Sequence, residues 1–170
     1  DRTDAQVLSM RKPKVKIPSG ASLNFPFGIR GKLRMRIQMK PNDNWINRQH
    51  YYFCLTDFFC MPRLPDVGPG SGEFETGWGP FPAGGRFTWR IAPDGEIGIA
   101  TERGIYQTIF ARTHAALEVG KWHTLELNWD CAKGVCSLAL DGRHLADMPQ
   151  LSRAEGVCYL RLWMQGHPLE

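Results

Sequence analysis

The sequence predicts an all-β fold, a sandwich of two antiparallel sheets, and three observations support this prediction. Apolar and polar residues alternate with a period of two in segment after segment, as in strands with one buried and one exposed face. Turn signals separate these segments. The 170 residues include 18 glycines and 12 prolines, the two residue types that most often mark turns. No sustained alternation of strands with helical patterns is present, which disfavours a parallel α/β fold.

The strands are predicted from this alternation, one after another along the chain. Residues 32–40 (KLRMRIQMK) alternate almost without exception, and residues 93–95 (PDG) form a turn between two later strands. Residues 112–120 (RTHAALEVG) suggest at most a single helical turn. The predicted strands are 32–40, 50–56, 86–92, 96–101, 104–111, 122–130, 135–142 and 158–165. Residues 40–49 and the Pro/Gly-rich residues 61–85 are predicted loops, and a loop as long as the second is usually functional.

Length and charge limit the classes of protein to which the chain can belong. With 42% hydrophobic and 22% charged residues, residues 1–170 are expected to form a single domain. The chain opens with Asp1 and not Met, which is consistent with a piece of a larger protein with other domains. The net charge of +4 is modest and residues 11–16 (RKPKVK) are the only basic run, so no nucleic-acid partner is expected. No apolar stretch approaches the roughly 18 residues of a membrane span, so no membrane partner is expected either.

The five cysteines are Cys54, Cys60, Cys131, Cys136 and Cys158, an odd number for a disulfide framework. Cys131 and Cys136 flank a turn, so they are either bridged across a hairpin or two buried thiols. Their spacing differs from that of zinc knuckles, and no metal site is predicted.

Residues 120–145 (GKWHTLELNWDCAKGVCSLALDGRHL) carry a recognisable pattern. Gly120, Trp122 and His123 open an alternating strand, and a second strand ends in an Asp-Gly turn at residues 141–142. This pattern resembles the laminin-G-like and concanavalin A-like jelly-roll superfamily, and the resemblance is best over residues 86–165. Such domains include lectins, carbohydrate-binding modules, glycoside hydrolases, polysaccharide lyases and protein-binding modules, so the fold does not decide the activity.

The resemblance implies further properties. It implies a jelly-roll sandwich and a secreted, periplasmic or cell-surface location. Many relatives carry a structural calcium ion, but Asp94, Asp130 and Asp141 are expected to form Asx turns, so calcium is left open and no ligands are assigned. Relatives usually close with one further strand that returns beside the first, and no segment after residue 166 is left to supply it.

A ligand-binding face is predicted from the outward residues of the strands. In the resembled superfamily one sheet is concave, and its open face is a frequent glycan groove. Aromatic rings stack on sugars, and arginine binds carboxylates or sulfates through two parallel hydrogen bonds. The predicted groove residues are Arg34, Arg36, Gln38, His50, Tyr52, Arg90, Glu126, Asn128, Tyr159, Arg161, Trp163 and Gln165. Trp45 and Trp78, in the two predicted loops, are expected to frame the groove.

The predicted function is therefore a lectin-like module that binds a polysaccharide or oligosaccharide, with an acidic glycan as one option. A glycoside hydrolase needs two carboxylates across the scissile bond, and only Glu73 and Glu75 alternate, in a glycine-rich segment. A lyase would need a Tyr or His base with arginines, which the predicted groove contains, but no known lyase motif is present. No catalytic residue is predicted. A lyase or hydrolase of the same fold and a protein-interaction module remain the alternatives.

Overall fold

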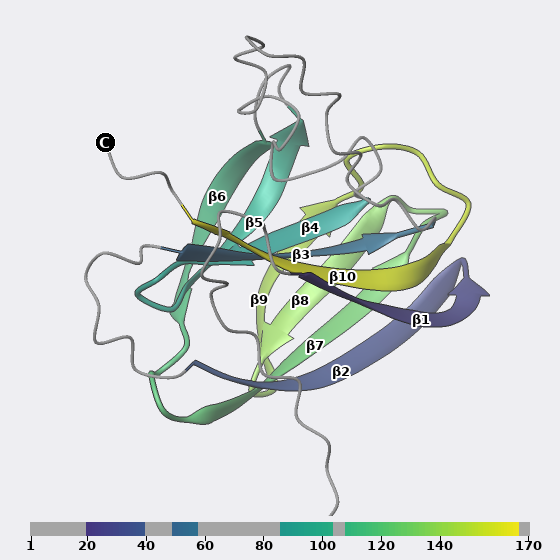
Figure 1. Cartoon of the computed structure of the whole chain (residues 1–170). Helices are drawn as coiled ribbons and strands as arrows, with labels where there is room; N and C mark the ends of the chain where they lie inside the picture. The colour runs from purple at the N-terminus through teal and green to yellow at the C-terminus, as the bar shows by residue number, and fades with distance from the viewer. Residues whose placement is uncertain (1–19, 40–48, 58–85, 104–107, 167–170) are drawn as a thin grey trace, which may run out of the picture.

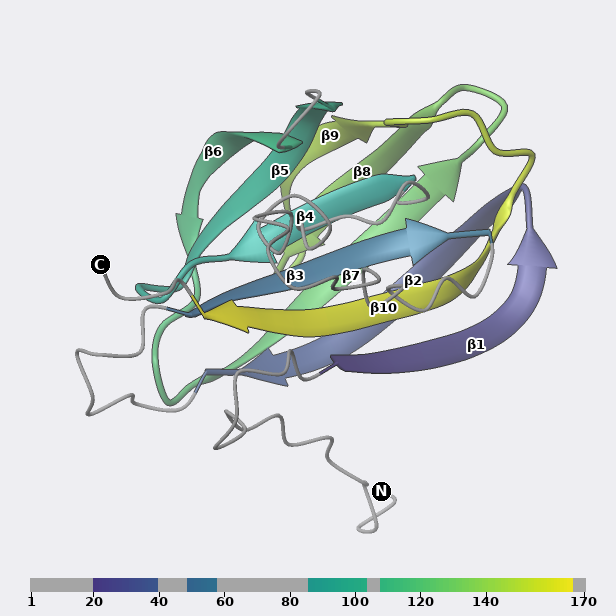
Figure 2. The ribbon, with the colours of Figure 1, turned by 45° about the horizontal axis from the view of Figure 1, so that its top comes forward.

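The computed structural model describes residues 20–39, 49–57, 86–103 and 108–166. These residues form two antiparallel sheets that lie face to face (Figures 1 and 2), which confirms the predicted all-β sandwich. The strands are β1 (Gly20–Gly28), β2 (Arg30–Gln38), β3 (Gln49–Thr56), β4 (Phe87–Ile91), β5 (Glu96–Arg103), β6 (Thr108–Ala116), β7 (Trp122–Asp130), β8 (Val135–Leu140), β9 (Arg143–Pro149) and β10 (Val157–Gly166). Within this described part, no helix is long and apolar enough to cross a membrane.

The two sheets have different strand orders. The six-stranded sheet runs β1-β10-β3-β4-β5-β6, and the four-stranded sheet runs β2-β7-β8-β9. In β7, burial alternates along the strand, because Leu125, Leu127 and Trp129 point between the sheets. Phe53 and Trp89 stack in the same core with ring centroids 5.2 Å apart. Each such large apolar side chain contributes roughly 1.5–3 kcal/mol of burial free energy.

Three elements differ from the sequence prediction, and one of them is β9, which pairs with β8 but was not predicted as a strand. Strand β1 was not predicted, because Pro26 lies within it and Gly20 and Gly28 bound it; an edge strand tolerates proline. The predicted helical turn at residues 112–120 is wrong, since residues up to Ala116 belong to β6 and pair with β5. Register shifts between β5 and β6 and a φ of 57° at His114 interrupt the pairing, and they obscure the strand pattern in the sequence.

The closing strand is also different from the expectation. β10 lies between β1 and β3, with Leu160 opposite Leu23 on one side and opposite Leu55 on the other. The last strand is therefore itself the one that returns beside the first strand. A further strand is not needed for that position in the sheet.

The Gly-x-Trp-His and Asp-Gly signature forms a hydrogen-bonded corner. His123 is buried, and its Nε2 accepts a hydrogen bond of 2.9 Å from the backbone N–H of Glu118. Its Nδ1–H therefore donates to Asp141, at 2.7 Å, while the other Asp141 oxygen accepts the Thr124 N–H at 2.7 Å. Asp141 and Gly142 have φ values of 50° and 82°, which the turn requires and which Asp and Gly tolerate. One acidic side chain thus connects the start of β7 to the end of β8.

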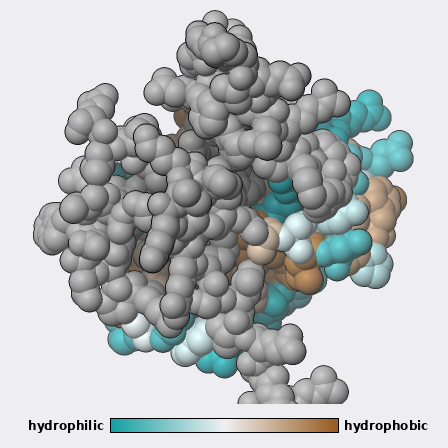
Figure 3. Space-filling view, in the orientation of Figure 1, coloured by the Kyte–Doolittle hydropathy of each residue, from teal (hydrophilic) through white to brown (hydrophobic). Residues whose placement is uncertain are grey.

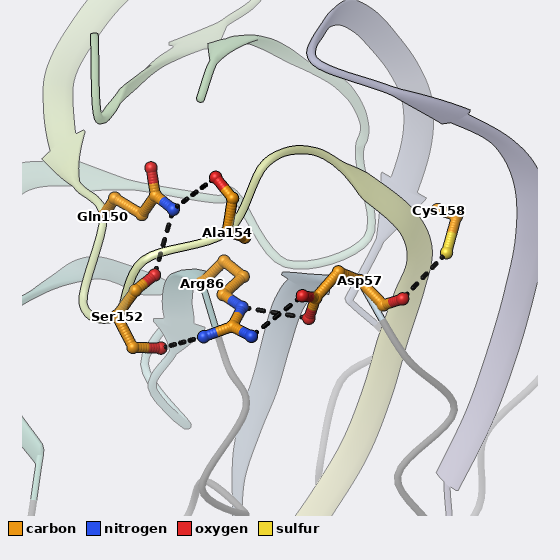
Figure 4. Close-up of polar contacts among 6 residues, drawn as sticks. All are labelled: Asp57, Arg86, Gln150, Ser152, Ala154 and Cys158. Atoms are coloured by element: carbon orange, nitrogen blue, oxygen red, sulfur yellow. Dashed lines mark hydrogen bonds and ion pairs between the residues drawn. The ribbon is translucent and has the colours of Figure 1, made fainter. Parts of the chain in front are cut away.

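A second polar cluster joins the end of β3 to the residue before β4 (Figure 4). Arg86 Nε and one terminal nitrogen donate to the two Asp57 oxygens at 2.9 and 2.8 Å, a bidentate pair. The Arg86 guanidinium also contacts the Ser152 hydroxyl, in the segment between β9 and β10. Gln150 donates to the backbone oxygens of Ser152 and Ala154 and so shapes that segment.

The described cysteines are free thiols. Cys54, Cys131 and Cys136 are buried, and Cys158 is half-buried. Of the two alternatives for Cys131 and Cys136, the structure has two buried thiols. Burial raises the pKa of Cys136 to about 12, and the neighbouring Cys131 and Asp147 add to this effect. Cys60 lies outside the described residues.

Candidate ligand-binding face

The predicted groove residues lie on two different sheets. Those on β2 and β7 belong to the four-stranded sheet, and those on β3, β4 and β10 belong to the six-stranded sheet. Side-chain parity indicates which face of a strand is outward, but not which sheet the strand joins, and the chain changes sheets between β1 and β2 and again between β2 and β3. This corrects the prediction of one shared groove. The four-stranded sheet carries Arg34, Arg36, Gln38, Glu126 and Asn128, and the six-stranded sheet carries His50, Tyr52, Arg90, Tyr159, Arg161, Trp163 and Gln165. Trp45 and Trp78 lie outside the described residues.

On the six-stranded sheet the register brings several of these positions into one row. Trp163 pairs with Tyr52, Tyr52 with Arg90, Arg90 with Gly98, and Gly98 with Arg112. Residues directly opposite one another in neighbouring strands point to the same face of the sheet. The row therefore crosses five strands with an arginine at its centre and another at its end.

The neighbouring row on this face is different in character. It contains Arg161, Cys54 and Thr88, and Cys54 and Thr88 are 0% exposed. Tyr52 is also buried, at 8%. Tyr52, Cys54 and Thr88 are thus closed to a ligand, whereas Arg90, in the same row as Tyr52, is half-buried and Arg112, at the end of that row, is exposed.

Arg90 is held in place by aromatic rings and by a glycine. Its guanidinium lies 4.5 Å from the centroid of the Phe110 ring, in cation–π geometry. The ring centroids of Phe110 and Tyr52 are 6.0 Å apart. Burial raises the pKa of Tyr52, and the charge of Arg90 and its hydrogen bond to the hydroxyl partly oppose this. A Cβ on Gly98 would lie 3.3 Å from Arg90 Nε, so the absence of a side chain lets Arg90 cross β5 and reach Phe110.

At the Arg112 end of this row, an open depression of about 380 Å³ lies between the β4–β5 turn and β6. Its charged lining includes Arg112 and Glu96, whose Nε and Oε2 are 3.2 Å apart. Asp94 accepts the Glu96 N–H at 3.0 Å, as an Asx turn requires. His114 also lines the depression, together with Ala115 and Ala116. The depression thus offers charged groups of both signs as hydrogen-bond donors and acceptors, which suits a ligand with many hydroxyls.

Several predicted residues on the opposite sheet have partners within the chain. Glu126 lies 2.7 Å from Lys32 and 3.3 Å from Arg34, and the hydrogen bond from Lys32 lowers the pKa of Glu126. Gln38 donates to the Gly120 carbonyl at 2.7 Å. These contacts give Glu126 and Gln38 structural partners within the chain.

Asp94 and Asp130 accept local backbone N–H groups, as expected for turn aspartates, but Asp141 accepts one from a residue 17 positions earlier, which is not an Asx turn. Asp94, Asp130 and Asp141 accept the backbone N–H groups of Glu96, Lys133 and Thr124, respectively. Among the described ranges, no group of three or more His, Cys, Asp or Glu side chains is placed to hold a metal ion. Glu73 and Glu75 lie outside these ranges.

Sequence reasoning missed the β6 side of this face. Phe110, Arg112 and Glu96 were not among the predicted residues, and Gly98 was not recognised as the position that Arg90 crosses. Phe110 and Arg112 share parity, so extending the predicted strand 104–111 by one residue would have found them. No pattern in the sequence signals the contact between Arg90 and Phe110, because it joins two strands that are not neighbours in the sheet.

No protein-family model matches the chain, and no curated protein matches it. Among solved structures, a sialidase superposes with a TM-score of 0.62 at 12% identity, over 89% of this chain and 11% of that chain. A double variant of human galectin-16 superposes with a TM-score of 0.51 at 8% identity, over 94% of this chain and 96% of that one. The fold is the concanavalin A-like jelly roll. Carbohydrate-binding module CBM66 from Bacillus subtilis superposes more weakly, with a TM-score of 0.45 at 12% identity, over 90% of this chain and 81% of that one. Identities this low show a shared fold and not a shared site.

Proposed function

We propose that this jelly roll is a carbohydrate-binding, lectin-like module whose ligand occupies the outward face of the six-stranded sheet around Arg90 and Arg112. The solved structures that share its fold include galectins and a carbohydrate-binding module, which supports glycan binding as the class of function. The residues that support this location are on β4, β5 and β6.

The observation that carries the proposal is the environment of Arg90. Its guanidinium is half-buried and packed on Phe110, yet among the described residues it forms no ion pair with a carboxylate. A partly buried cation without a counter-ion is costly, so a ligand that supplies an acceptor gains from binding there. The ion pair of Arg112 and Glu96 adds a donor and an acceptor at the edge of the open depression. We therefore propose a polysaccharide or oligosaccharide with acidic groups as the preferred ligand.

The test is a glycan array with neutral and acidic polysaccharides at two salt concentrations, followed by titration of the best ligand. Arg90→Gln should weaken binding about tenfold or more, the magnitude of one charge-assisted hydrogen bond. Arg143→Gln is the matched control, since it removes the same charge from an exposed position at the start of β9, in the other sheet. Thermal melts of both variants check that the fold is retained.

Three outcomes would count against this function. If no glycan is bound, the carbohydrate-binding proposal fails and a protein partner becomes the better explanation. If binding is equally lost in Arg143→Gln, the site is elsewhere. An unsaturated product that absorbs near 235 nm after incubation with a uronate polymer would instead indicate a lyase.

A further inference from the structure

The outward face of the four-stranded sheet carries a row of cations along its edge strand, β2. Arg30, Lys32, Arg34 and Arg36 alternate with the core residues of this strand, and all four are exposed. Successive outward residues on a strand are about 6.6–6.8 Å apart, so these four charges form a regular line. We call these four residues together with Trp122 the β2 strip.

The strip has fewer carboxylates than cations. Arg30 Nε lies 2.9 Å from Asp130, and Glu126 is shared between Lys32 and Arg34. In the described part of the chain Arg36 has no carboxylate partner. Two carboxylates therefore face four cations, and the side chains of Arg30 and Arg34 are each 69% exposed, so they are available to a further anion.

An aromatic side chain ends the strip. The Arg36 guanidinium lies 5.1 Å from the centroid of the Trp122 ring, and Trp122 is 44% exposed, which is unusual for tryptophan. Gln38 fixes the neighbouring turn through the Gly120 carbonyl. The strip thus offers both a line of positive charge and a partly exposed ring.

Protection of an edge strand explains only part of this arrangement. Charged side chains on an edge strand prevent pairing with other chains, and either sign serves that purpose. Four charges of one sign repel one another, and an exposed tryptophan does not protect an edge. A linear polyanion removes the repulsion and accounts for both features.

We propose that the β2 strip is a second binding site, for a linear sulfated polysaccharide, on the opposite face of the sandwich from Arg90. Three of its four cations are arginines, whose planar and weakly hydrated guanidinium groups bind oxyanions through two hydrogen bonds. A nucleic acid fits less well, because Arg36 covers one face of Trp122 and the net charge of the chain is only +4. This site does not depend on the function proposed for the six-stranded sheet.

The test is retention of the whole chain on immobilised dextran sulfate as a function of salt, with the variant Arg34→Gln/Arg36→Gln. Counter-ion release predicts that the slope of log K against log salt falls by about 2 in this variant. The matched control is Lys133→Gln/Arg143→Gln, which removes the same net charge from exposed positions away from β2. The control should lose little, and Trp122→Ala should weaken retention without changing the slope.

Three results would overturn the proposal. Equal losses in the variant and in its control would mean that only net charge matters. Wild-type protein that passes through the matrix at low salt would exclude the site. Tighter binding to a single-stranded oligonucleotide than to dextran sulfate at the same salt would assign the β2 strip to nucleic acid. Binding of other glycans that is unaffected by Arg34→Gln/Arg36→Gln would leave the function of the six-stranded sheet intact.

Discussion

His123 and Asp141 are joined by a hydrogen bond of 2.7 Å between Nδ1 and Oδ2, although 18 residues separate them. This hydrogen bond and that from Thr124 lower the pKa of Asp141. A carboxyl whose pKa is lower in the folded state adds stability above its unfolded pKa, and that stability is lost as the pH falls through the folded value. We therefore expect unfolding free energy to decline below about pH 4, and to decline less in Asp141→Asn.

The same corner predicts the effect of removing the imidazole. His123→Ala leaves the Glu118 N–H and the Asp141 carboxylate without their partner and should cost about 2 kcal/mol of stability at pH 7. His144→Ala, which removes an exposed histidine paired with Asp147, is the control and should cost little. Urea unfolding measures both, and equal costs would contradict a structural role for the corner.

Gly31 should not tolerate even one methyl group. A Cβ there would lie 2.2 Å from Cζ2 of Trp129, a buried ring that also donates to the Gly28 carbonyl at 3.0 Å. Gly31→Ala should destabilise the protein by about 1–3 kcal/mol through overpacking. The cost should be smaller when Trp129 is replaced by Leu, and a double-mutant cycle of unfolding free energies measures this difference. Additive costs would show that the two residues do not compete for space.

A substitution at Gly98 tests the ligand-binding face without replacing Arg90 or Arg112. Valine at this position has good strand propensity, but its side chain occupies the space that the Arg90 side chain crosses. Gly98→Val should displace Arg90 from Phe110 and weaken glycan binding about tenfold. Isothermal titration against the best array ligand measures the loss, with Gly98→Ala as the milder control. Unchanged affinity in Gly98→Val would mean that the position of Arg90 is irrelevant.

Cys136 should be inert in the folded protein. With a pKa of about 12 against an ordinary 9.0, it has roughly a thousandfold less thiolate at neutral pH than an unperturbed thiol. Timed alkylation with site-resolved mass spectrometry should label Cys158, which is half-buried, well before Cys136. Labelling of both at the same rate without denaturant would contradict the buried position.

The strand pattern predicted the fold because burial on one face imposes a period of two, which β2, β7 and β8 follow closely. Strands β1 and β9 and the second half of β6 were not predicted; Pro26 interrupts β1, and register shifts interrupt the pairing of β6 with β5. The site was predicted less well. Alternation placed Tyr52 and Arg90 on an outward face, and the register makes them neighbours.

Alternation could not assign Arg34 and Arg90 to different sheets, since strand order depends on long-range pairing. Nor could it show that Tyr52 is buried on that outward face. The secreted, periplasmic or cell-surface location stays a prediction.

The Arg86–Asp57 pair bears on how the length and sequence of the segment between these two residues can vary. Asp57 and Arg86, which flank residues 58–85 in the chain, have side chains joined by hydrogen bonds of 2.9 and 2.8 Å. The ends of the intervening segment are therefore fixed by the sandwich, and doubling its length would cost only about 0.6 kcal/mol of closure entropy. This junction is where segments of other lengths and sequences can be grafted, so the jelly roll can serve as a scaffold whose inserted segment diversifies while its two sheets stay constant.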